Sequence, residues 1–436
     1  MTATKRSIRI LLNGGDNMLG RGVQLSCWHQ TSGDAEIHDS MPASYYLQAA
    51  LHPGHDPRTD PSLNEIRDLN RHGHYIWGDY LGLQFGQPPD LRILNLETAV
   101  TTSIFNDDVP LQKGINYHLH CDNLPELFEA FAAEAHGDSS PTPFVIAFAN
   151  NHALDFGRRA FEQESLPLLR GRFNMVGAGA DFADAARPFT LNIGDSHLQT
   201  FAMATGCSGT PSSWAAMENR SGLIYLPALR SEEDVDRAFT IAKRVFEPHD
   251  HPASGVIRIL SIHWGPNWAY RYNDGQLYRQ MFAHRLIDEC GVHLIYGHSS
   301  HHIRGFERYR QKLIVYGAGD LINDYEGFMN PGDEKYPEFG AWIVVDISPV
   351  YGELRHIRLI PTFMDRLRLT RLHSDRTIWH PPTRSRKPLQ DAAVKLCKFL
   401  NSLSSSDVGR HDSMKASIQF HIVNDEDNLP VLETKD

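Results

Sequence analysis

Five short apolar runs along the chain each end directly in residues that can bind a metal ion or move a proton. The runs and their endings are Ile8–Leu12 before Asn13–Asn17, Leu91–Leu94 before Asn95–Glu97, Phe144–Phe148 before Ala149–His152, Val256–Ile262 before His263–Gly265, and Val292–Tyr296 before Gly297–His302. Such runs, alternating with helical patterns, are typical of buried strands in an α/β sheet. Because ligands bind beyond the carboxyl ends of these strands, the five endings predict one polar site at that edge.

Other segments complete the α/β pattern. A sixth strand is predicted at Leu313–Tyr316, and paired strands separated by turn residues predict hairpins within Phe189–Met203 and Ala341–Ile360. Apolar residues at helical spacing predict helices at Asn123–Phe131, Gly157–Arg170, Glu232–Phe246 and Gln276–Cys290.

We expect one catalytic domain over residues 1–382, with two segments outside the regular pattern. Residues 29–72 are polar and rich in Pro, Asp and His, which predicts an irregular insertion or a lid over the site. Residues 383–436 contain one amphipathic helical pattern, Leu389–Leu403, followed by serines and a polar end. They are predicted to form a helical and polar appendage outside the core.

Composition excludes several classes of protein. No apolar run approaches the ~18 residues that a transmembrane helix needs, and the first apolar run leads into a glycine turn, which favours a strand over a signal peptide. The five scattered cysteines suit a reduced chain, so a cytoplasmic location without membrane attachment is predicted. A formal net charge of −11 argues against a nucleic-acid-binding protein, and the oligomeric state stays open.

The residue types at the strand ends indicate a metal site. Asp, Glu, Asn and His offer oxygen and nitrogen ligands, which suit a divalent Mn, Zn, Fe, Mg or Ca ion better than a thiolate-seeking metal. Packed together, these groups repel or desolvate one another unless a cation lies among them. Each ending alone has an ordinary explanation as a cap, a turn or packing, but five at equivalent positions are hard to explain that way.

The motifs also resemble a known family. They are GDNMLGRG, NLETAVT, ANNHALDFG, GAGADFADAARP, SIHWGPNW, GHSSHHIRGFERY and LIVYGAGDLINDY. In this order, over residues 7–325, they are similar to the CapA/PgsA-type poly-γ-glutamate synthesis proteins, which have the calcineurin-like metallophosphoesterase fold. The resemblance implies a four-layer α/β/β/α sandwich.

The resemblance also implies roles for individual residues. The implied metal ligands are Asp16, Glu97, Asn151, His263, His298 and His301. Glu97 takes the position of the bridging carboxylate, and His152 lies close to the substrate. Met18 stands where a standard metallophosphoesterase has the histidine of Asp-x-His, and Ser300 replaces a usual proline. Asp320 is a further ligand or acceptor candidate.

The favoured function is a peptide epimerase that converts an L- to a D-residue by proton transfer at Cα, because the resemblance implies members that act on peptides in this way. One base must remove the proton and an acid must return one on the other face. The acid–base candidates are His152, His263, His301 and Asp155, and the candidate substrate contacts are Arg21, Arg158, Trp264, Trp268, Arg271 and Arg304. A metal-dependent phosphoesterase is the alternative, and a non-catalytic scaffold comes third.

Overall fold

The structure is a computed structural model. It describes residues 6–31, 41–51, 60–83, 87–104, 108–110, 113–133, 141–249, 255–267, 274–326, 339–372, 377–380, 385–388, 392–406, 416–427 and 429–434. Its described helices are α1 (Arg21–Leu25), α2 (Ala43–Leu51), α3 (Leu63–Asn70), α4 (Asn123–Ala133), α5 (Gly157–Ala160), α6 (Leu166–Arg172), α7 (Phe182–Ala185), α8 (Glu232–Phe246), α9 (Asp274–Cys290) and α10 (Ala392–Ser406). The predicted helix at 157–170 is realised as α5 and α6 joined by a π-helical turn.

The first sheet contains three of the predicted polar strand ends. Its strands are β23 (Phe420–Asn424), β24 (Pro430–Thr434), β18 (Leu354–Asp365), β17 (Gly340–Ile347), β1 (Ile8–Asn17), β2 (Leu91–Leu96), β5 (Phe144–Ala147) and β6 (Asn174–Val176) in spatial order, with β16 (Asp320–Ile322) beside β1 and β19 (Arg368–Arg371) beside β18. Strands β1, β2, β5 and β6 are parallel, so their carboxyl ends lie at one edge. Strands β17 and β18 pair antiparallel, as the predicted hairpin requires.

The second sheet contains the other two ends. Its spatial order is β11 (Tyr225–Leu226), β9 (Ser196–Thr205), β12 (Val256–His263), β13 (Val292–His298), β15 (Lys312–Val315), β14 (Phe306–Tyr309) and β22 (Ala416–Ser417), with β8 (Phe189–Ile193) beside β9. The register of the parallel pair β12–β13 sets His263 directly beside His298. Short two-stranded pairs are β3 (Ala99–Val100) with β4 (His118–Leu119), β7 (Ala178–Gly179) with β10 (Gly222–Leu223), and β20 (Thr377–His380) with β21 (Ser385–Pro388).

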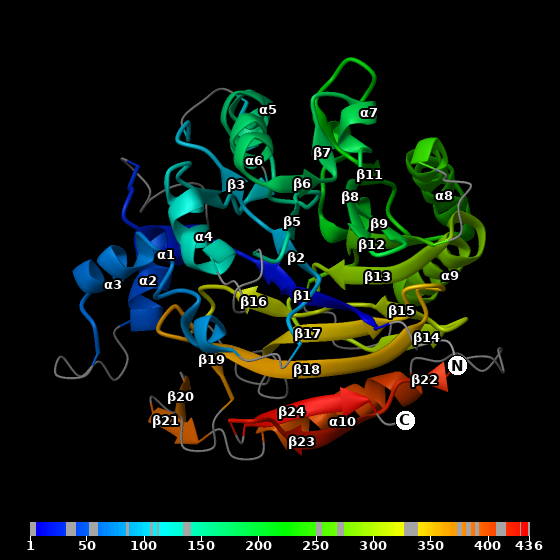
Figure 1. The fold of residues 1–436 in the computed structure, drawn as a ribbon. Coiled ribbons are helices and arrows are strands. Elements are labelled where there is room, and N and C mark those ends of the chain that lie inside the picture. The colour runs from blue at the N-terminus through cyan, green and yellow to red at the C-terminus, as the bar shows by residue number, and fades with distance from the viewer. Residues whose placement is uncertain are drawn as a thin grey trace.

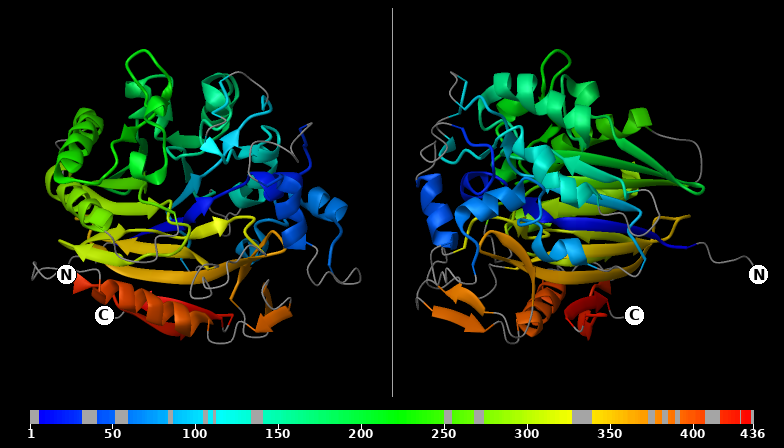
Figure 2. Two further views of the ribbon diagram at one scale, coloured as in Figure 1. Left: turned by 180° about the vertical axis from the view of Figure 1, so that it is seen from behind. Right: turned by 60° about the vertical axis from the view of Figure 1, so that its left-hand side comes forward.

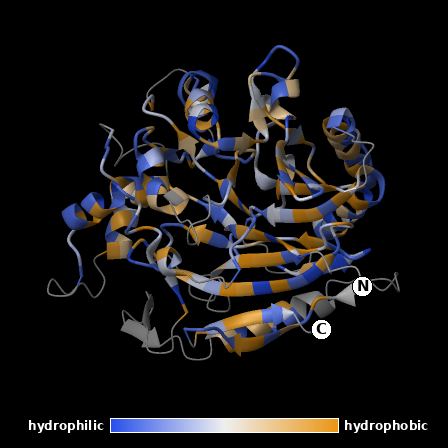
Figure 3. Cartoon of the chain, in the orientation of Figure 1, coloured by the Kyte–Doolittle hydropathy of each residue, from blue (hydrophilic) through white to orange (hydrophobic). Residues whose placement is uncertain are grey.

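The two sheets pack face to face between outer helices (Figures 1 and 2). Side chains of β12 alternate between the two faces, because successive residues of a strand point to opposite sides. Ile257 and Ile259 share an apolar core with β1 and β2 of the first sheet, whereas Leu260 and Ile262 pack with α8 and α9. This arrangement confirms the predicted α/β/β/α sandwich, and Figure 3 shows the hydrophobic stretches along its strands.

The carboxy-terminal tail is built into the sandwich. Strand β24 pairs with β18, and β22 pairs with β14, so the tail extends both sheets. Leu400 of α10 and Leu432 of β24 are fully buried in the core shared by the two sheets. The prediction of an appendage outside the core is therefore wrong for α10 and β24, because apolar side chains of both elements belong to the core. The domain boundary at residue 382 stays a prediction.

The polar segment 29–72 is partly helical, which corrects the prediction of an irregular insertion. Its described part contains α2 and α3, and α3 begins with a capping box in which Ser62 and Glu65 bond each other's backbone N–H groups. Ile66 of α3 is fully buried in the first core. A lid function for this segment stays a prediction. Among the helices described, none has the length and apolar character needed to cross a membrane.

Candidate active site

The polar ends of all five predicted strands meet in one buried cluster. Strands β1 and β2 deliver Asp16 and Glu97, the turn after β5 delivers Asn151, and β12 and β13 deliver His263 and His298. Asp16, Glu97 and His263 are 0% exposed. A hydrogen bond from the Tyr296 hydroxyl of the second sheet to the Gly14 carbonyl of the first helps to hold the two strand-end edges together.

Asp16 lies at the centre of the cluster. Its Oδ1 accepts a hydrogen bond from Asn95 Nδ2 at 2.8 Å, and its Oδ2 accepts one from the backbone N–H of Ser299 at 2.8 Å. Its carboxylate oxygens lie 3.5 Å from His263 Nδ1, 3.7 Å from His298 Nδ1 and 3.7 Å from His301 Nδ1. Three imidazoles thus surround one buried carboxylate.

The turn after β13 brings His301 back to this cluster in an unusual backbone conformation. Ser299 has φ 88° and His301 has φ 56°, both in the left-handed region that residues other than glycine rarely adopt. Each such residue costs of order 1–3 kcal/mol, and strain of this kind concentrates at functional sites. Ser299 uses this conformation to donate its backbone N–H to Asp16.

The donor set fits a divalent cation. Four buried atoms in the described cluster have no hydrogen-bond partner: Glu97 Oε1, Glu97 Oε2, Asn151 Oδ1 and His263 Nε2. Buried polar atoms are almost always paired, so these four indicate a missing positive partner. Within this cluster, two residue groups place their ligand atoms within 4.8 Å of one another: Asp16 with His263 and His298, and Asp16 with Glu97 and His301. Asp16 is the carboxylate common to both groups, whereas the resemblance gives the bridging position to Glu97.

Burial controls the protonation of these groups. It raises the pKa of Asp16 to about 6, and together with the nearby Asp16 charge it raises the pKa of Glu97 well above its usual range. Burial lowers the pKa of His298 to about 3 and, with the neighbouring imidazoles, lowers the pKa of His263 well below its ordinary value. The two imidazoles are therefore neutral, which is the form that binds a metal.

His152 forms a buried triad with Asp155 and Lys113. His152 Nδ1 lies 2.5 Å from Asp155 Oδ2 and 2.9 Å from Lys113 Nζ, and Lys113 also bonds Asp155 Oδ1. Burial, followed by the Lys113 charge, lowers the pKa of His152 well below its usual value, and burial raises the pKa of Asp155 to about 7. The Tyr117 ring stacks on His152 with centroids 4.0 Å apart. His152 Nε2 lies 3.8 Å from Glu97 Oε1.

His301 forms a second carboxylate–imidazole pair on the other side of the cluster. His301 Nδ1 lies 2.9 Å from Asp320 Oδ1, and Asp320 Oδ2 accepts a hydrogen bond from Asn323. Burial alone would lower the pKa of His301, but the charge of Asp320 and the hydrogen bond to it outweigh burial and raise that pKa. The pKa values of the two histidines are therefore shifted in opposite directions.

Lys113 and Tyr117 were not predicted as site residues. Both belong to the segment before and around β4, in the sequence Lys-Gly-Ile-Asn-Tyr, which has no motif with a known chemical role. The one usable signal is a lysine in a chain segment that also holds Tyr117, His118 and His120, and that signal is weak.

Arg21 does not present a free guanidinium to a substrate. It binds both oxygens of Asp324, and its Cζ lies over the Tyr46 ring at 3.7 Å and the Tyr117 ring at 4.5 Å. The Tyr117 and Tyr325 hydroxyls lie 3.2 Å apart beneath it. The prediction that Arg21 clamps a substrate carboxylate therefore finds no support, because Asp324 already takes that place; the arginine instead holds the rings beside His152.

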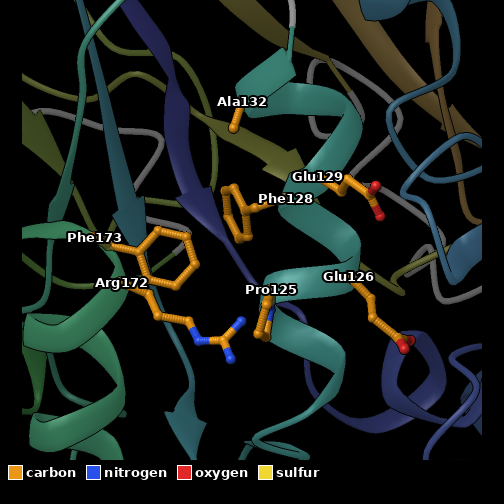
Figure 4. A pocket seen from close by; sticks show the side chains of 7 residues that line it. All are labelled: Pro125, Glu126, Phe128, Glu129, Ala132, Arg172 and Phe173. Atoms are coloured by element: carbon orange, nitrogen blue, oxygen red, sulfur yellow. The ribbon is translucent and has the colours of Figure 1, made fainter.

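The other predicted substrate contacts are dispersed. Trp264 lies in the core, 1% exposed and stacked on Tyr316, so it forms no substrate wall. Arg158 donates to the carbonyls of Ser213 and Ser221. Arg304 is buried. Trp268 and Arg271 lie outside the described residues. A hollow between α4 and the end of α6 contains none of the predicted site residues; Figure 4 shows its lining by Pro125, Glu126, Phe128, Glu129, Ala132, Arg172 and Phe173.

Comparison with known proteins gives a consistent result. Residues 10–325 match the family described as bacterial capsule synthesis protein PGA_cap. A probable polyglutamine synthesis accessory protein of Mycobacterium tuberculosis is 33% identical over 373 residues, which cover 85% of this chain and 88% of that protein. The capsule biosynthesis protein CapA of Bacillus anthracis is 21% identical over 232 residues, which cover 52% of each chain.

Solved structures resemble the chain only distantly. A hypothetical protein from Thermus thermophilus gives a TM-score of 0.36 at 11% identity and covers 81% of this chain and 98% of its own. A putative 5'-nucleotidase from Staphylococcus aureus gives a TM-score of 0.37 at 9% identity and covers 85% of this chain and 55% of its own.

Proposed function

The chain belongs to the PGA_cap family of bacterial capsule synthesis proteins, and from that premise we propose that it is a peptide epimerase, which inverts an amino-acid residue at Cα within a peptide. The relatives are named for polyglutamine synthesis and for capsule biosynthesis. The proposed substrate is accordingly a peptide rich in glutamyl or glutaminyl residues.

One observation carries the proposal: two carboxylate-backed imidazoles border the same buried cluster from different sheets. His152, with Asp155, approaches Glu97 from the end of β5, and His301, with Asp320, approaches Asp16 from the end of β13. A carboxylate on one ring nitrogen orients the imidazole and fixes its tautomer. Inversion at a carbon needs such a pair, one group to remove a proton and one to return a proton on the other face.

In the proposed reaction one proton leaves Cα on one face and another proton is added to Cα on the opposite face. His152 removes the Cα proton, and the electron pair of the broken C–H bond moves into the adjacent carbonyl to give an enolate. His301 then donates its proton to the opposite face of Cα, and solvent exchange restores both histidines. A divalent cation held by Asp16, Glu97, Asn151, His263 and His298 would supply positive charge near the developing enolate oxygen.

The proposal is tested by incubating short L-glutamyl and L-glutaminyl peptides with the protein in D₂O. The expected product has one deuterium at Cα, an intact backbone and D-residues detectable by chiral analysis after hydrolysis. The activity should be lost in His152→Ala and kept in His284→Ala, a matched control whose imidazole pairs with Glu307 outside the cluster. Absence of Cα deuterium in both peptide series, with and without added Mn²⁺ or Zn²⁺, would contradict the proposal.

A metal-dependent phosphoesterase is the second candidate, and the observation that favours it is the pair of ligand groups sharing Asp16. Two cations held side by side can activate water and stabilise a leaving oxygen. Met18, buried where Asp-x-His has its histidine, removes one ligand and weighs against this function. Mn²⁺-dependent phosphate release from an aryl phosphate, without Cα exchange in peptides, would establish it instead.

A further inference from the structure

We propose a second metal site, separate from the strand-end cluster, formed by His29, His120, Asp122 and Glu126. Its ligand set of two imidazoles and two carboxylates suits a four-coordinate Zn²⁺ ion. The four residues come from the segment after α1, the turn after β4, and the first turns of α4. This site rests on its own geometry and does not depend on the proposed epimerase activity.

The ligand atoms already lie close together. One atom each from His29, His120 and Asp122 lies within 4.8 Å of the others. His29 Nε2 lies 3.2 Å from Glu126 Oε1, and His120 Nδ1 lies 3.8 Å from Asp122 Oδ2. The His29 and His120 rings are nearly parallel, with centroids 5.5 Å apart.

A second, independent observation points to a ligand at this place. Glu126 Oε2 is buried and has no hydrogen-bond partner within the described structure. Figure 4 shows the Glu126 side chain turned away from Arg172 and Phe173. An acceptor oxygen withdrawn from water without a donor costs about 1–3 kcal/mol, and a cation bound beside it would remove that cost.

Two buried amides fix the backbone on which the histidines stand. Asn123 accepts a hydrogen bond from the His29 N–H at 2.9 Å and donates one to the His29 carbonyl at 2.8 Å. Gln24 donates to the same carbonyl, accepts from the His120 N–H at 3.0 Å, and bonds Asn123. These hydrogen bonds fix the backbone positions of both histidines.

Occupancy of this site would fasten α1 to the start of α4. Helix α1 begins with Arg21, which packs on Tyr117, and Tyr117 lies at the other end of the short β4 segment from His120. A zinc ion bound by His29 and His120 would therefore help to fix the position of Tyr117, the ring that stacks on His152. Because binding to the folded state alone stabilises it, zinc should raise the melting temperature.

The test is a zinc titration of chelator-treated full-length protein, with bound zinc measured by mass spectrometry of the metal and stability by thermal unfolding. H29A/H120A should bind one equivalent of zinc fewer than wild type. The zinc-dependent rise in Tm that comes from this site should be lost in H29A/H120A and kept in H263A/H298A. H72A/H74A is the matched control. These exposed histidines have ring centroids 6.0 Å apart, and His72 pairs with Glu129 of α4.

Equal zinc stoichiometry in wild type and H29A/H120A would overturn the proposal. If that double variant does not fold, D122N/E126Q provides the same comparison with smaller changes, and a decrease of tenfold or more in affinity for one zinc equivalent is expected. Unchanged affinity for every equivalent in D122N/E126Q would overturn the proposal equally.

Discussion

The two carboxylate–imidazole pairs of the site are alike in distance, but the pKa values of their histidines are shifted in opposite directions. His152 lies 2.5 Å from Asp155 and His301 lies 2.9 Å from Asp320, yet the pKa of His152 is lowered and that of His301 is raised. Burial lowers the pKa of both histidines. At His152 the positive charge of Lys113 adds to burial, whereas at His301 the charge of Asp320, the hydrogen bond to it and the charge of Asp16 outweigh burial. A carboxylate partner therefore does not by itself decide the charge of a buried histidine; the whole set of neighbouring charges does.

The largest expected effect comes from replacing His152 or His301, because each histidine is proposed to exchange the Cα proton of only one enantiomer of the substrate residue. H301A should still wash deuterium into the L-peptide, because His152 removes and returns the proton on one face, but should form about 10²- to 10⁴-fold less D-product. H152A should exchange only when the D-peptide is supplied. Mass spectrometry and chiral analysis of both peptides measure this, and equal behaviour of the two variants would remove the assignment of one face to each histidine.

A second prediction concerns the carboxylate between the two pairs. Glu97→Gln should weaken divalent-cation binding at the strand-end cluster by at least about tenfold, because a charged ligand is lost. In chelator the same variant should be more stable than wild type by about 1–2 kcal/mol, since burial and the nearby Asp16 charge disfavour the Glu97 carboxylate and an amide carries no charge. Denaturant unfolding with and without Mn²⁺ measures both effects. Lower stability in chelator would mean that Glu97 has a structural partner.

A third prediction removes the asymmetry itself. Lys113→Met should raise the pKa of His152, because a positive charge beside the ring is lost. It should slow exchange from the L-peptide by about 10- to 100-fold, because the Lys113 hydrogen bonds that orient His152 and Asp155 are lost as well. Exchange from the D-peptide, which starts at His301, should change less. Lys243→Met on the surface of α8 is the control and should leave both rates unchanged. Equal slowing in both directions would show that Lys113 serves the cluster as a whole.

The smallest expected effect concerns the stability contributed by a histidine–carboxylate pair outside the site, His284 with Glu307. Glu307 bonds His284 at 2.8 Å, and although burial would raise its pKa, hydrogen bonds from His284, Tyr316 and Gln280 lower it. Its stability contribution is therefore present above the unfolded carboxyl pKa and lost as pH falls through the lower folded value. Glu307→Gln should cost about 1–2 kcal/mol at pH 7 and less in acid, with no change in peptide exchange. Unfolding curves at several pH values measure this.

Much of the fold followed from local patterns. Helix α8 matches its predicted bounds, and strands β2, β5, β12 and β13 lie within a few residues of theirs. Each was recognisable because a run of apolar residues reports burial locally. Helices α2 and α3 were missed because their apolar residues are few and lie among Pro and Asp. The tail was misplaced because pairing of β24 with β18 joins residues about 70 positions apart, which leaves no local signal.

The sequence by itself determined which side chains stand at the ends of the strands, since strand, turn and ligand residue follow one another along the chain. Asp16, Glu97, Asn151, His263 and His298 were identifiable on that basis. Only the tertiary structure decided that the ends of two different sheets meet, that Lys113 reaches His152 from a loop, and that Asp324 occupies Arg21. These pairings depend on how distant elements pack and desolvate one another, and that information is not contained in any short stretch of residues.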